Sequence, residues 1–131
     1  MKKDLIYPAG HPAPRGSYSP GIRIRLGDAT LLFMTGQLAV DPGGNVVAPG
    51  DAAGQAAYVF GLVGSILAAA GMDFGDVVKV DTFLTDMADF GKFSAVRNRH
   101  FPSEPPVSTL IEVKGLARAG CLVEIEVVAI K

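Results

Sequence analysis

The chain has 131 residues, the size of one domain, and its 12 Lys and Arg residues are balanced by 13 Asp and Glu residues. The net charge of −1 excludes the broad cationic face that neutralises a run of phosphates, which argues against nucleic acid as a partner. The lone Cys121 excludes an intramolecular disulfide, and the first residues lack the apolar core of a signal peptide. We therefore expect a single cytoplasmic domain over 1–131 that acts on a small ligand.

No charged residue occurs between Asp51 and Asp73, and a segment of that length can span a bilayer. Asp51 is suited to the N-cap of a helix and Gly71 to the position that follows its end. The larger apolar residues recur at the spacing of one helix face, as Val59, Leu62, Val63, Ile66 and Leu67. This pattern predicts a core helix over 52–70 that packs against a sheet, and it argues against a membrane span.

A β-hairpin is predicted before this helix. Residues 22–26 alternate apolar and charged side chains, which is the period of a half-exposed strand. After a turn at Gly27 and Asp28, the apolar run 30–34 predicts a second strand, antiparallel to the first and buried on both faces. The Gly- and Pro-rich segment 41–50 predicts a loop that leads into the helix.

The second half of the chain predicts a further helix among strands. β-branched and aromatic residues predict a strand over 77–85. Large apolar residues at regular helical intervals predict a helix from about Ala88 that ends by Pro102. Two more strands are predicted at 107–113 and 121–130. The expected fold class is α+β, a mixed sheet with two helices on one face, because each helix needs an apolar layer to cover.

The last predicted strand carries two carboxylates. Glu124 and Glu126 are two residues apart and point to the same face of the strand, about 7 Å from each other at the usual strand rise. One interpretation is a solvated face. The other is that one Glu lies in a partly apolar cleft, where it orients or deprotonates a water molecule. Periodicity alone does not distinguish them.

A glycine and a tyrosine are further candidates for a ligand site. Gly36 follows a strand, where the absence of a side chain lets a ligand reach backbone N–H groups, although such a glycine is more often only a bend. Tyr18 lies in a turn-rich stretch, where its ring can line a pocket or simply pack under a loop. Both interpretations remain open for each residue.

The remaining chemistry-bearing residues have structural interpretations. His11 and His100 are far apart in sequence and lack neighbours at metal-ligand spacing, so we expect no metal. Arg97, Arg99 and His100 fall in the last turn of the second helix, where cations complement the helix dipole. Cys121 is expected to be a small packing residue. No nucleophile elbow, phosphate loop or dinucleotide fingerprint occurs.

Several short motifs, distributed over nearly the whole chain in one order, resemble the Rid/YjgF family. Its members are reactive-intermediate (enamine/imine) deaminases, also described as L-PSP endoribonuclease-like or translation-inhibitor proteins. The motifs are Gly16-Ser17-Tyr18, Thr35-Gly36-Gln37, Ala69-Ala70-Gly71, Val77-Val78-Lys79-Val80, Asp89-Phe90 and Val123-Glu124-Ile125-Glu126-Val127.

The resemblance implies a chorismate-mutase-like fold that assembles as a homotrimeric barrel, with ligand clefts at the subunit interfaces. A trimer accounts for a 49% apolar composition in a small domain, since sheet faces are buried between protomers. Family members hydrolyse 2-imino acids to 2-keto acids and ammonia without a cofactor. Addition of water to a C=N carbon needs a group that places the water, donors that hold the substrate and a cation for its carboxylate.

Three positions match the family's site when it is carried over residue by residue. The resemblance implies that Glu124 positions the water, that Tyr18 lines the pocket and that the backbone of Gly36 borders the ligand.

Three other positions depart from the family's pattern. The arginine that grips the substrate carboxylate in the family corresponds to Ser108, a cysteine corresponds to Leu110, and an asparagine falls near Ser94. A serine hydroxyl is neither charged nor forked, so ordinary 2-imino acids lose a bidentate contact. Ser108 and Thr109 are expected to hydrogen-bond a differently shaped substrate instead. Candidate replacement cations are Arg97, Arg99 and Lys114.

We therefore expect a deaminase of an imine or enamine metabolite other than ordinary 2-imino acids. The alternative is a non-catalytic protein that binds or senses a small metabolite in the same interface cleft. Endoribonuclease activity rests only on the family's historical name, and the near-neutral charge argues against it.

Overall fold

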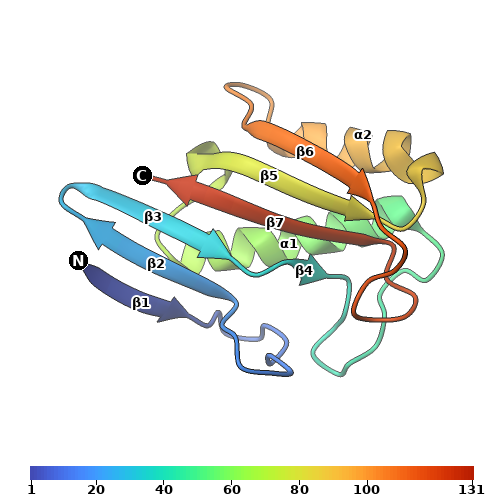
Figure 1. Cartoon of the computed structure of the whole chain (residues 1–131), viewed down its shortest axis with the longest axis horizontal. Coiled ribbons are helices and arrows are strands. Elements are labelled where there is room, and N and C mark those ends of the chain that lie inside the picture. The colour runs from blue at the N-terminus through green and yellow to red at the C-terminus, as the bar shows by residue number, and fades with distance from the viewer.

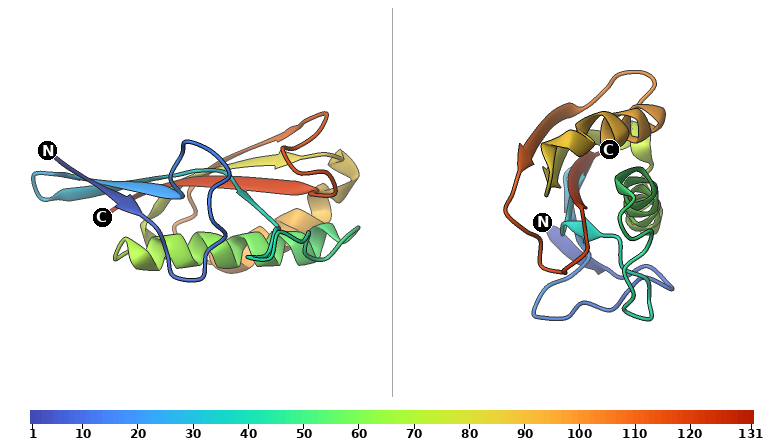
Figure 2. Two further views of the ribbon diagram at one scale, coloured as in Figure 1. Left: turned by 90° about the horizontal axis from the view of Figure 1, so that it is seen from below. Right: turned by 90° about the vertical axis from the view of Figure 1, so that its right-hand side faces the viewer.

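The computed structural model describes all 131 residues as a mixed sheet with a helical layer on one face (Figures 1 and 2). The helices are α1 (Ala52–Ala69) and α2 (Phe90–His100), with short 3₁₀ turns η1 (Phe74–Asp76) and η2 (Met87–Asp89). The strands are β1 (Lys2–Ile6), β2 (Gly21–Leu26), β3 (Ala29–Met34), β4 (Gln37–Leu38), β5 (Val77–Leu84), β6 (Val107–Glu112) and β7 (Val123–Ile130). The α+β class predicted from the sequence is confirmed.

The strands lie in the order β1-β2-β3-β7-β5-β6, and the short β4 continues the line of β3 along β7. Neighbouring strands are antiparallel except β5 and β6, which are parallel because α2 crosses between them. The last strand in sequence, β7, therefore lies in the middle of the sheet. It pairs with β3 and β4 on one side and with β5 on the other.

The predicted hairpin is confirmed, but the prediction that its second strand is buried on both faces is wrong. In β3, Leu32 and Met34 are buried beneath the helices, whereas Phe33 is 45% exposed on the opposite face. Both helices lie on one face of the sheet, so the chain itself leaves the other face of β3 uncovered (Figure 2).

Helix α1 has the caps that the sequence predicts. The carboxylate of Asp51 accepts a hydrogen bond from the Gly54 N–H at 2.9 Å. At the other end Gly71 adopts a φ of 78°, and the Met72 N–H donates to the Leu67 carbonyl at 2.9 Å. By length and composition this helix is apolar enough to cross a membrane, but here its apolar stripe is buried against the sheet. It is therefore the central core element.

Helix α2 is held to α1 by an aromatic cluster. The ring centroids of Phe60 and Phe93 are 6.2 Å apart, and the His100 ring lies 4.6 Å from both Phe60 and Phe74. Burial, followed by the charge of Arg99, lowers the pKa of His100. The half-buried His100 thus packs against this cluster, and Arg97, Arg99 and His100 lie in the last turn of α2, as the sequence predicts.

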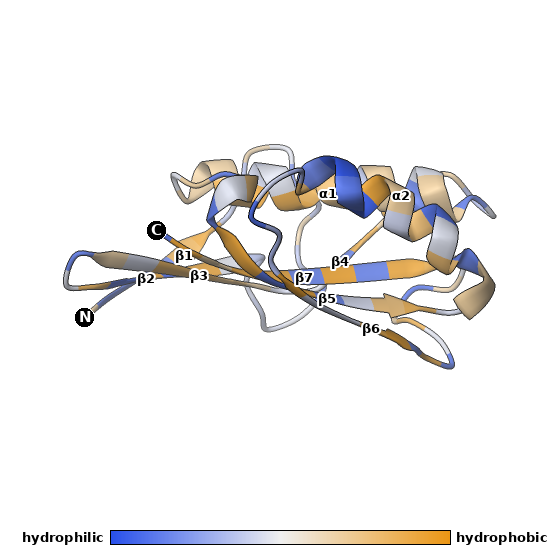
Figure 3. Cartoon of the chain, turned by 90° about the horizontal axis from the view of Figure 1, so that it is seen from above, coloured by the Kyte–Doolittle hydropathy of each residue, from blue (hydrophilic) through white to orange (hydrophobic).

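The face of the sheet opposite the helices is open and partly apolar. Along β7 the buried residues alternate with half-buried ones, a pattern that Figure 3 shows as alternating hydrophobic and hydrophilic colours. Large apolar side chains that share this open face with Glu124 and Glu126 remain 43–67% exposed, namely Leu5, Phe33, Val107, Ile111 and Ile130. A surface of this kind is typical of a sheet that packs against another subunit.

Candidate functional site

Glu124 lies on the open face of β7, between Leu38 of β4 and Phe83 of β5 in the strand register. Its carboxyl group lies directly against Gly36. A Cβ atom built on Gly36 would come within 2.9 Å of the carboxyl carbon and of Oε1 of Glu124, closer than real Cβ contacts allow. Gly36 therefore makes room for this carboxyl group.

Burial raises the pKa of Glu124, and the nearby charge of Glu126 raises it further. Glu126 is in a similar position: burial raises its pKa first, Asp81 raises it further, and Lys79 acts in the opposite direction. A half-buried carboxyl group with a raised pKa is suited to exchanging protons with a bound molecule.

The backbone around Gly36 is held rigidly. The Thr35 N–H donates to the Pro20 carbonyl at 2.9 Å, and the Thr35 hydroxyl donates to the Ser19 carbonyl at 2.6 Å. The buried Gln37 side chain donates to the Thr35 carbonyl at 2.7 Å. The Gly36 N–H itself is not a donor in any of the turn and loop hydrogen bonds. A fixed, unpaired N–H beside a carboxyl group can hold an oxygen or nitrogen of a ligand.

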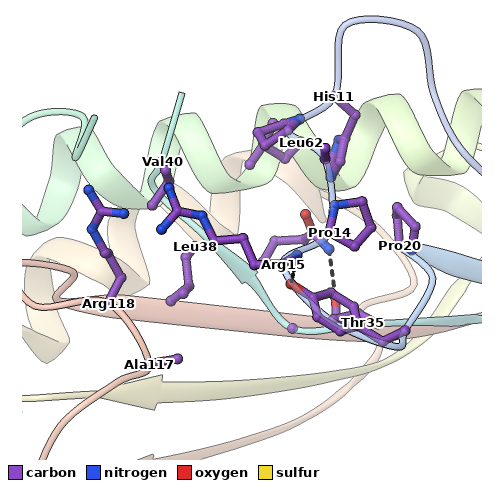
Figure 4. Close-up of a pocket in the computed structure, with 15 residues that line it drawn as sticks. His11, Pro14, Arg15, Pro20, Thr35, Leu38, Val40, Leu62, Ala117 and Arg118 are labelled. Atoms are coloured by element: carbon purple, nitrogen blue, oxygen red, sulfur yellow. Dashed lines mark hydrogen bonds between the residues drawn. The ribbon is translucent and has the colours of Figure 1, made fainter. Parts of the chain in front are cut away.

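A cavity of about 360 Å³, here called the β4 cavity, opens beside this turn. Its walls include Leu38, which is labelled in Figure 4, together with Gly36 and with Tyr18 from the N-terminal loop. The Tyr18 hydroxyl accepts a hydrogen bond from the Arg15 N–H at 3.1 Å, which helps to hold the ring in the wall of the cavity. Tyr18 and Gly36, both predicted from the sequence, therefore line one cavity, and Glu124 lies against one of its walls.

The β4 cavity also holds cationic side chains that the sequence analysis did not single out for the site. Arg15 and Arg118 extend into it near Gly44 (Figure 4), and Arg118 donates to the Gly44 carbonyl. Burial lowers the pKa of His11, and the nearby Gln37 acts in the opposite direction. No carboxylate lines the cavity, so its electrostatic preference is for an anion.

A second cavity of about 430 Å³, the α2–β6 cavity, lies between helix α2 and strand β6. Ser108 and Leu110 project into it from β6, and Arg97 projects into it from α2. The Arg97 guanidinium donates to the Ser94 hydroxyl at 3.0 Å. Three of the sequence-predicted residues, Ser94, Ser108 and Leu110, thus lie in or next to this cavity.

Thr109 lies apart from both cavities. Neighbouring residues of a strand point to opposite faces, and in β6 it is Leu110 that packs toward the core. Thr109 is the register partner of Asp81, which places it on the open face of the sheet. Ser108 and Thr109 of one protomer therefore cannot contact the same small ligand.

The structure divides the predicted site into two groups that share no lining residue. Tyr18 and Gly36, with Glu124 behind them, belong to the β4 cavity, and Ser108 and Leu110 belong to the α2–β6 cavity. β4 and β6 lie on opposite sides of β7 in the sheet, with β5 between β7 and β6.

The other candidates are placed outside both cavities. Arg99 and Lys114 line neither of them and are exposed. Cys121 is buried, and its burial raises the pKa of the thiol, as suits a packing residue. No three His, Cys, Asp or Glu side chains gather where a metal ion could bind. Of the three candidate replacement cations, Arg97 alone lines one of the two cavities. Its spacing from Ser94, one helical turn, is consistent with their hydrogen bond, but the sequence did not show that Arg97 faces a cavity.

Comparisons with known proteins agree in fold and in sequence. The family described as Endoribonuclease L-PSP matches residues 9–131. Protein DfrA from Myxococcus xanthus is 35% identical over 130 residues, which cover 99% of this chain and 97% of that protein. The 2-iminobutanoate/2-iminopropanoate deaminase from Bos taurus is 35% identical over 131 residues, which cover 100% of this chain and 92% of that protein. The crystal structure of E. coli TdcF with bound serine has a TM-score of 0.84 and 30% identity, covering 98% of each chain.

Proposed function

The chain belongs to the endoribonuclease L-PSP family, the Rid/YjgF proteins, and we propose that it is a cytoplasmic, cofactor-independent deaminase that hydrolyses reactive imine or enamine metabolites. The observation that carries this proposal is the half-buried carboxyl group of Glu124, lying against Gly36 at the wall of a cavity. The bovine relative is named for the hydrolysis of short 2-imino acids, which supports the same reaction class.

In the proposed reaction a water molecule adds to the carbon of the C=N bond. From the protonated imine, Glu124 accepts a proton from this water as the C–O bond forms, and the π electrons of the C=N bond move to nitrogen to give an amino alcohol. Glu124 returns that proton to the nitrogen. As the C–N bond breaks, the hydroxyl group gives its proton to the Glu124 carboxylate, and a ketone and ammonia leave. The raised pKa of Glu124 suits both directions of proton transfer, and the Gly36 N–H is available to a polar atom of the substrate.

We further propose that the active unit is a homotrimer. The open face of the sheet exposes apolar side chains that one chain cannot cover, among them Phe33 and Ile111. The two groups of predicted site residues lie on opposite sides of β7, so a complete site needs a β4 cavity from one protomer and an α2–β6 cavity from its neighbour. Interface clefts of this kind are what the family resemblance implies.

The substrate range is proposed to differ from that of relatives that act on ordinary 2-imino acids. Ser108 occupies the position where the resemblance implies an arginine that binds the substrate carboxylate. A hydroxyl cannot make the forked, charge-assisted contact of a guanidinium. The anionic group of the substrate must therefore be bound differently in this chain.

A panel assay tests the proposal. Imines are generated in situ from several amino acids by an amino-acid oxidase, and ammonia release is followed with and without the purified protein. The wild type is expected to accelerate release from at least one imine, and Glu124→Ala is expected to lose at least about 100-fold in kcat. Equal rates with wild type and Glu124→Ala would remove Glu124 from the reaction, and no acceleration of any imine would contradict the proposal.

A non-catalytic role in binding or sensing a small metabolite is the second candidate. The solved structure of TdcF with bound serine shows that a related protein holds a small metabolite, which supports this alternative. Binding would raise the melting temperature of the protein in proportion to the logarithm of ligand concentration. A thermal shift with amino or keto acids, without turnover of any imine, would favour this role.

A further inference from the structure

Two arginines of the β4 cavity lie against the same residue, Gly44. Nη2 of Arg118 donates to the Gly44 carbonyl, and Nη2 of Arg15 lies 2.9 Å from the position that a Cβ atom on Gly44 would take. Because backbone positions of one residue are about 3 Å apart, the two Nη2 nitrogens lie within about 9 Å of each other. Figure 4 shows both side chains converging beside Val40. The fold thus brings together two cations that are far apart in sequence.

No carboxylate neutralises this pair of guanidinium groups. Neither arginine forms any of the ion pairs of the chain. Asp41 belongs to the same loop as Gly44, but its carboxylate is engaged by N–H groups of that loop, first of all by the Asn45 N–H at 2.9 Å, and these hydrogen bonds lower its pKa. Two like charges that lie close together repel each other, and an anion bound between them removes this repulsion.

Most hydrogen-bond donors of the pair are unused. The Arg15 side chain makes no hydrogen bond within the chain, and the Arg118 side chain makes only the one to Gly44. Both residues have anchored backbones, since the Arg15 N–H donates to the Tyr18 hydroxyl at 3.1 Å and the Arg118 carbonyl accepts from the Cys121 N–H at 3.2 Å. A guanidinium on an anchored backbone loses less conformational entropy when it binds an anion.

The spacing and the charge of the pair suit a phosphate group. Two hydrogen bonds of about 2.9 Å and the separation between two oxygens of one anion add up to about 8 Å, which is within the limit for the two Nη2 nitrogens. A phosphate monoester carries nearly two negative charges at neutral pH and three acceptor oxygens, whereas a carboxylate carries one charge. Two guanidinium groups at one place therefore match a phosphate better than a carboxylate.

The rest of the β4 cavity has room for the organic part of a ligand. Its volume of about 360 Å³ is in the range of small-molecule sites. Leu38 and Val40 form an apolar wall, and they follow Gly36 along the chain toward Gly44. A ligand whose anionic end is bound near Gly44 therefore extends along this wall toward Gly36.

We propose that Arg15 and Arg118 together bind the phosphate group of a phosphorylated small metabolite in the β4 cavity. The phosphate lies between the two guanidinium groups near Gly44, and the organic part of the metabolite packs on Leu38 and Val40. This binding site goes beyond the proposed deaminase function and does not depend on it, because phosphate binding requires no turnover.

Two rival explanations must be excluded. In the first, Arg118 only holds the loop over 41–45 through its contact with Gly44. In the second, the anion binds at Arg97 in the α2–β6 cavity. Arg15→Gln is the decisive variant, because the Arg15 side chain makes no hydrogen bond that its loss could break. Arg99 is exposed and lines neither cavity, so Arg99→Gln removes the same charge and is the matched control.

Calorimetry at constant ionic strength measures the binding of glycerol 3-phosphate and of succinate, a dicarboxylate of similar size. The wild type is expected to bind glycerol 3-phosphate at least about tenfold more tightly than succinate. Arg15→Gln and Arg118→Gln are each expected to weaken glycerol 3-phosphate binding at least about tenfold, because each variant loses charge-assisted hydrogen bonds. Arg15→Lys is expected to recover part of the loss, and Arg99→Gln is expected to bind as the wild type does.

Thermal unfolding keeps the inference falsifiable if Arg118→Gln loosens the loop over 41–45. Without phosphate, Arg15→Gln is expected to melt no lower than the wild type, since one of two like charges is removed. Inorganic phosphate is expected to raise the melting temperature of the wild type and of Arg99→Gln but not that of Arg15→Gln. A phosphate-induced rise in Arg15→Gln equal to that of the wild type would contradict the site.

Four calorimetric results would overturn the inference. They are no binding of glycerol 3-phosphate by the wild type, succinate binding as tight as that of glycerol 3-phosphate, unchanged glycerol 3-phosphate binding in Arg15→Gln, and loss of binding in Arg97→Gln with normal binding in Arg15→Gln.

The phosphate site and the deaminase function fail separately. Glycerol 3-phosphate binding that depends on Arg15, without ammonia release from any imine, would support the site and contradict the deaminase function. Turnover that depends on Glu124, without binding of glycerol 3-phosphate, would leave the deaminase function standing and overturn the site.

Discussion

The carboxyl group of Glu124 occupies the space that a side chain at position 36 would need, so that even a Cβ atom on Gly36 would approach its carbon to 2.9 Å. The contact joins the middle of β7 to the turn that precedes β4. It places the Glu124 carboxyl group beside Gly36, whose N–H donates none of the turn and loop hydrogen bonds.

Gly36→Ala is therefore expected to displace the Glu124 carboxyl group and to lower kcat at least about tenfold, since small misplacements of a catalytic group cost this much or more. The measurement is steady-state ammonia release. Gly91→Ala is the matched control, because nothing lies within 4 Å of a Cβ at that helical position. An unchanged kcat in Gly36→Ala would show that the contact does not position Glu124.

Gln55 is a buried polar side chain that fixes the loop before β7. Its amide nitrogen donates to the Gly120 carbonyl at 3.0 Å, and its amide oxygen accepts from the Leu122 N–H at 2.7 Å. Gln55→Leu leaves both backbone groups without partners and is expected to lower the free energy of unfolding by about 1–3 kcal/mol per unsatisfied group. Urea denaturation measures the loss. Ser65→Ala, on the exposed side of α1, is expected to change stability by less than about 0.5 kcal/mol.

The pKa of Glu126 is raised by burial and by Asp81. A carboxyl group whose pKa is higher in the folded than in the unfolded state favours folding at low pH, and this contribution is lost as pH rises from about 4.5 toward the folded pKa. Glu126→Gln is thus expected to melt at a higher temperature than wild type at pH 7, with the difference disappearing below about pH 4.5. Thermal unfolding at several pH values measures this, and a constant difference at all pH values would exclude the titration of Glu126 as its cause.

Phe33 tests the assembly. It is 45% exposed on the open face of the sheet, where a trimer would bury it. Phe33→Asp places a charge in that interface and is expected to convert the trimer to monomers and to abolish turnover. Light scattering coupled to size exclusion measures the mass. Met87→Asp alters a side chain that is 42% exposed in η2 and is not part of a strand; this control is expected to remain trimeric.

The helices and the longer strands could be predicted because their apolar periodicity is regular. β1 was not predicted because it is a short edge strand that begins with charged residues, a composition also typical of an unstructured chain end. β4 was not predicted because it has only two residues. The prediction that the strand over 30–34 is buried on both faces was wrong. An apolar run does not show whether the second face of the strand is covered by the same chain or left open for another subunit.

The site was predictable only in part, because cavity walls depend on which elements meet in space. Tyr18 and Gly36 could be singled out as candidates from turn and strand patterns. The division of the site into two cavities could not, since it follows from the sheet order. The position of Arg97 could not be predicted either: helical spacing allows its contact with Ser94, but only the packing of α2 beside β6 places Arg97 and Ser108 in the lining of one cavity.

The most direct test of the whole account compares kcat for ammonia release by wild type and Glu124→Gln on the best imine substrate, with both proteins shown to have the same mass and melting behaviour. A loss of at least about 100-fold in Glu124→Gln is expected if this carboxyl group takes the proton from the attacking water. Equal kcat values in the two proteins would contradict the account.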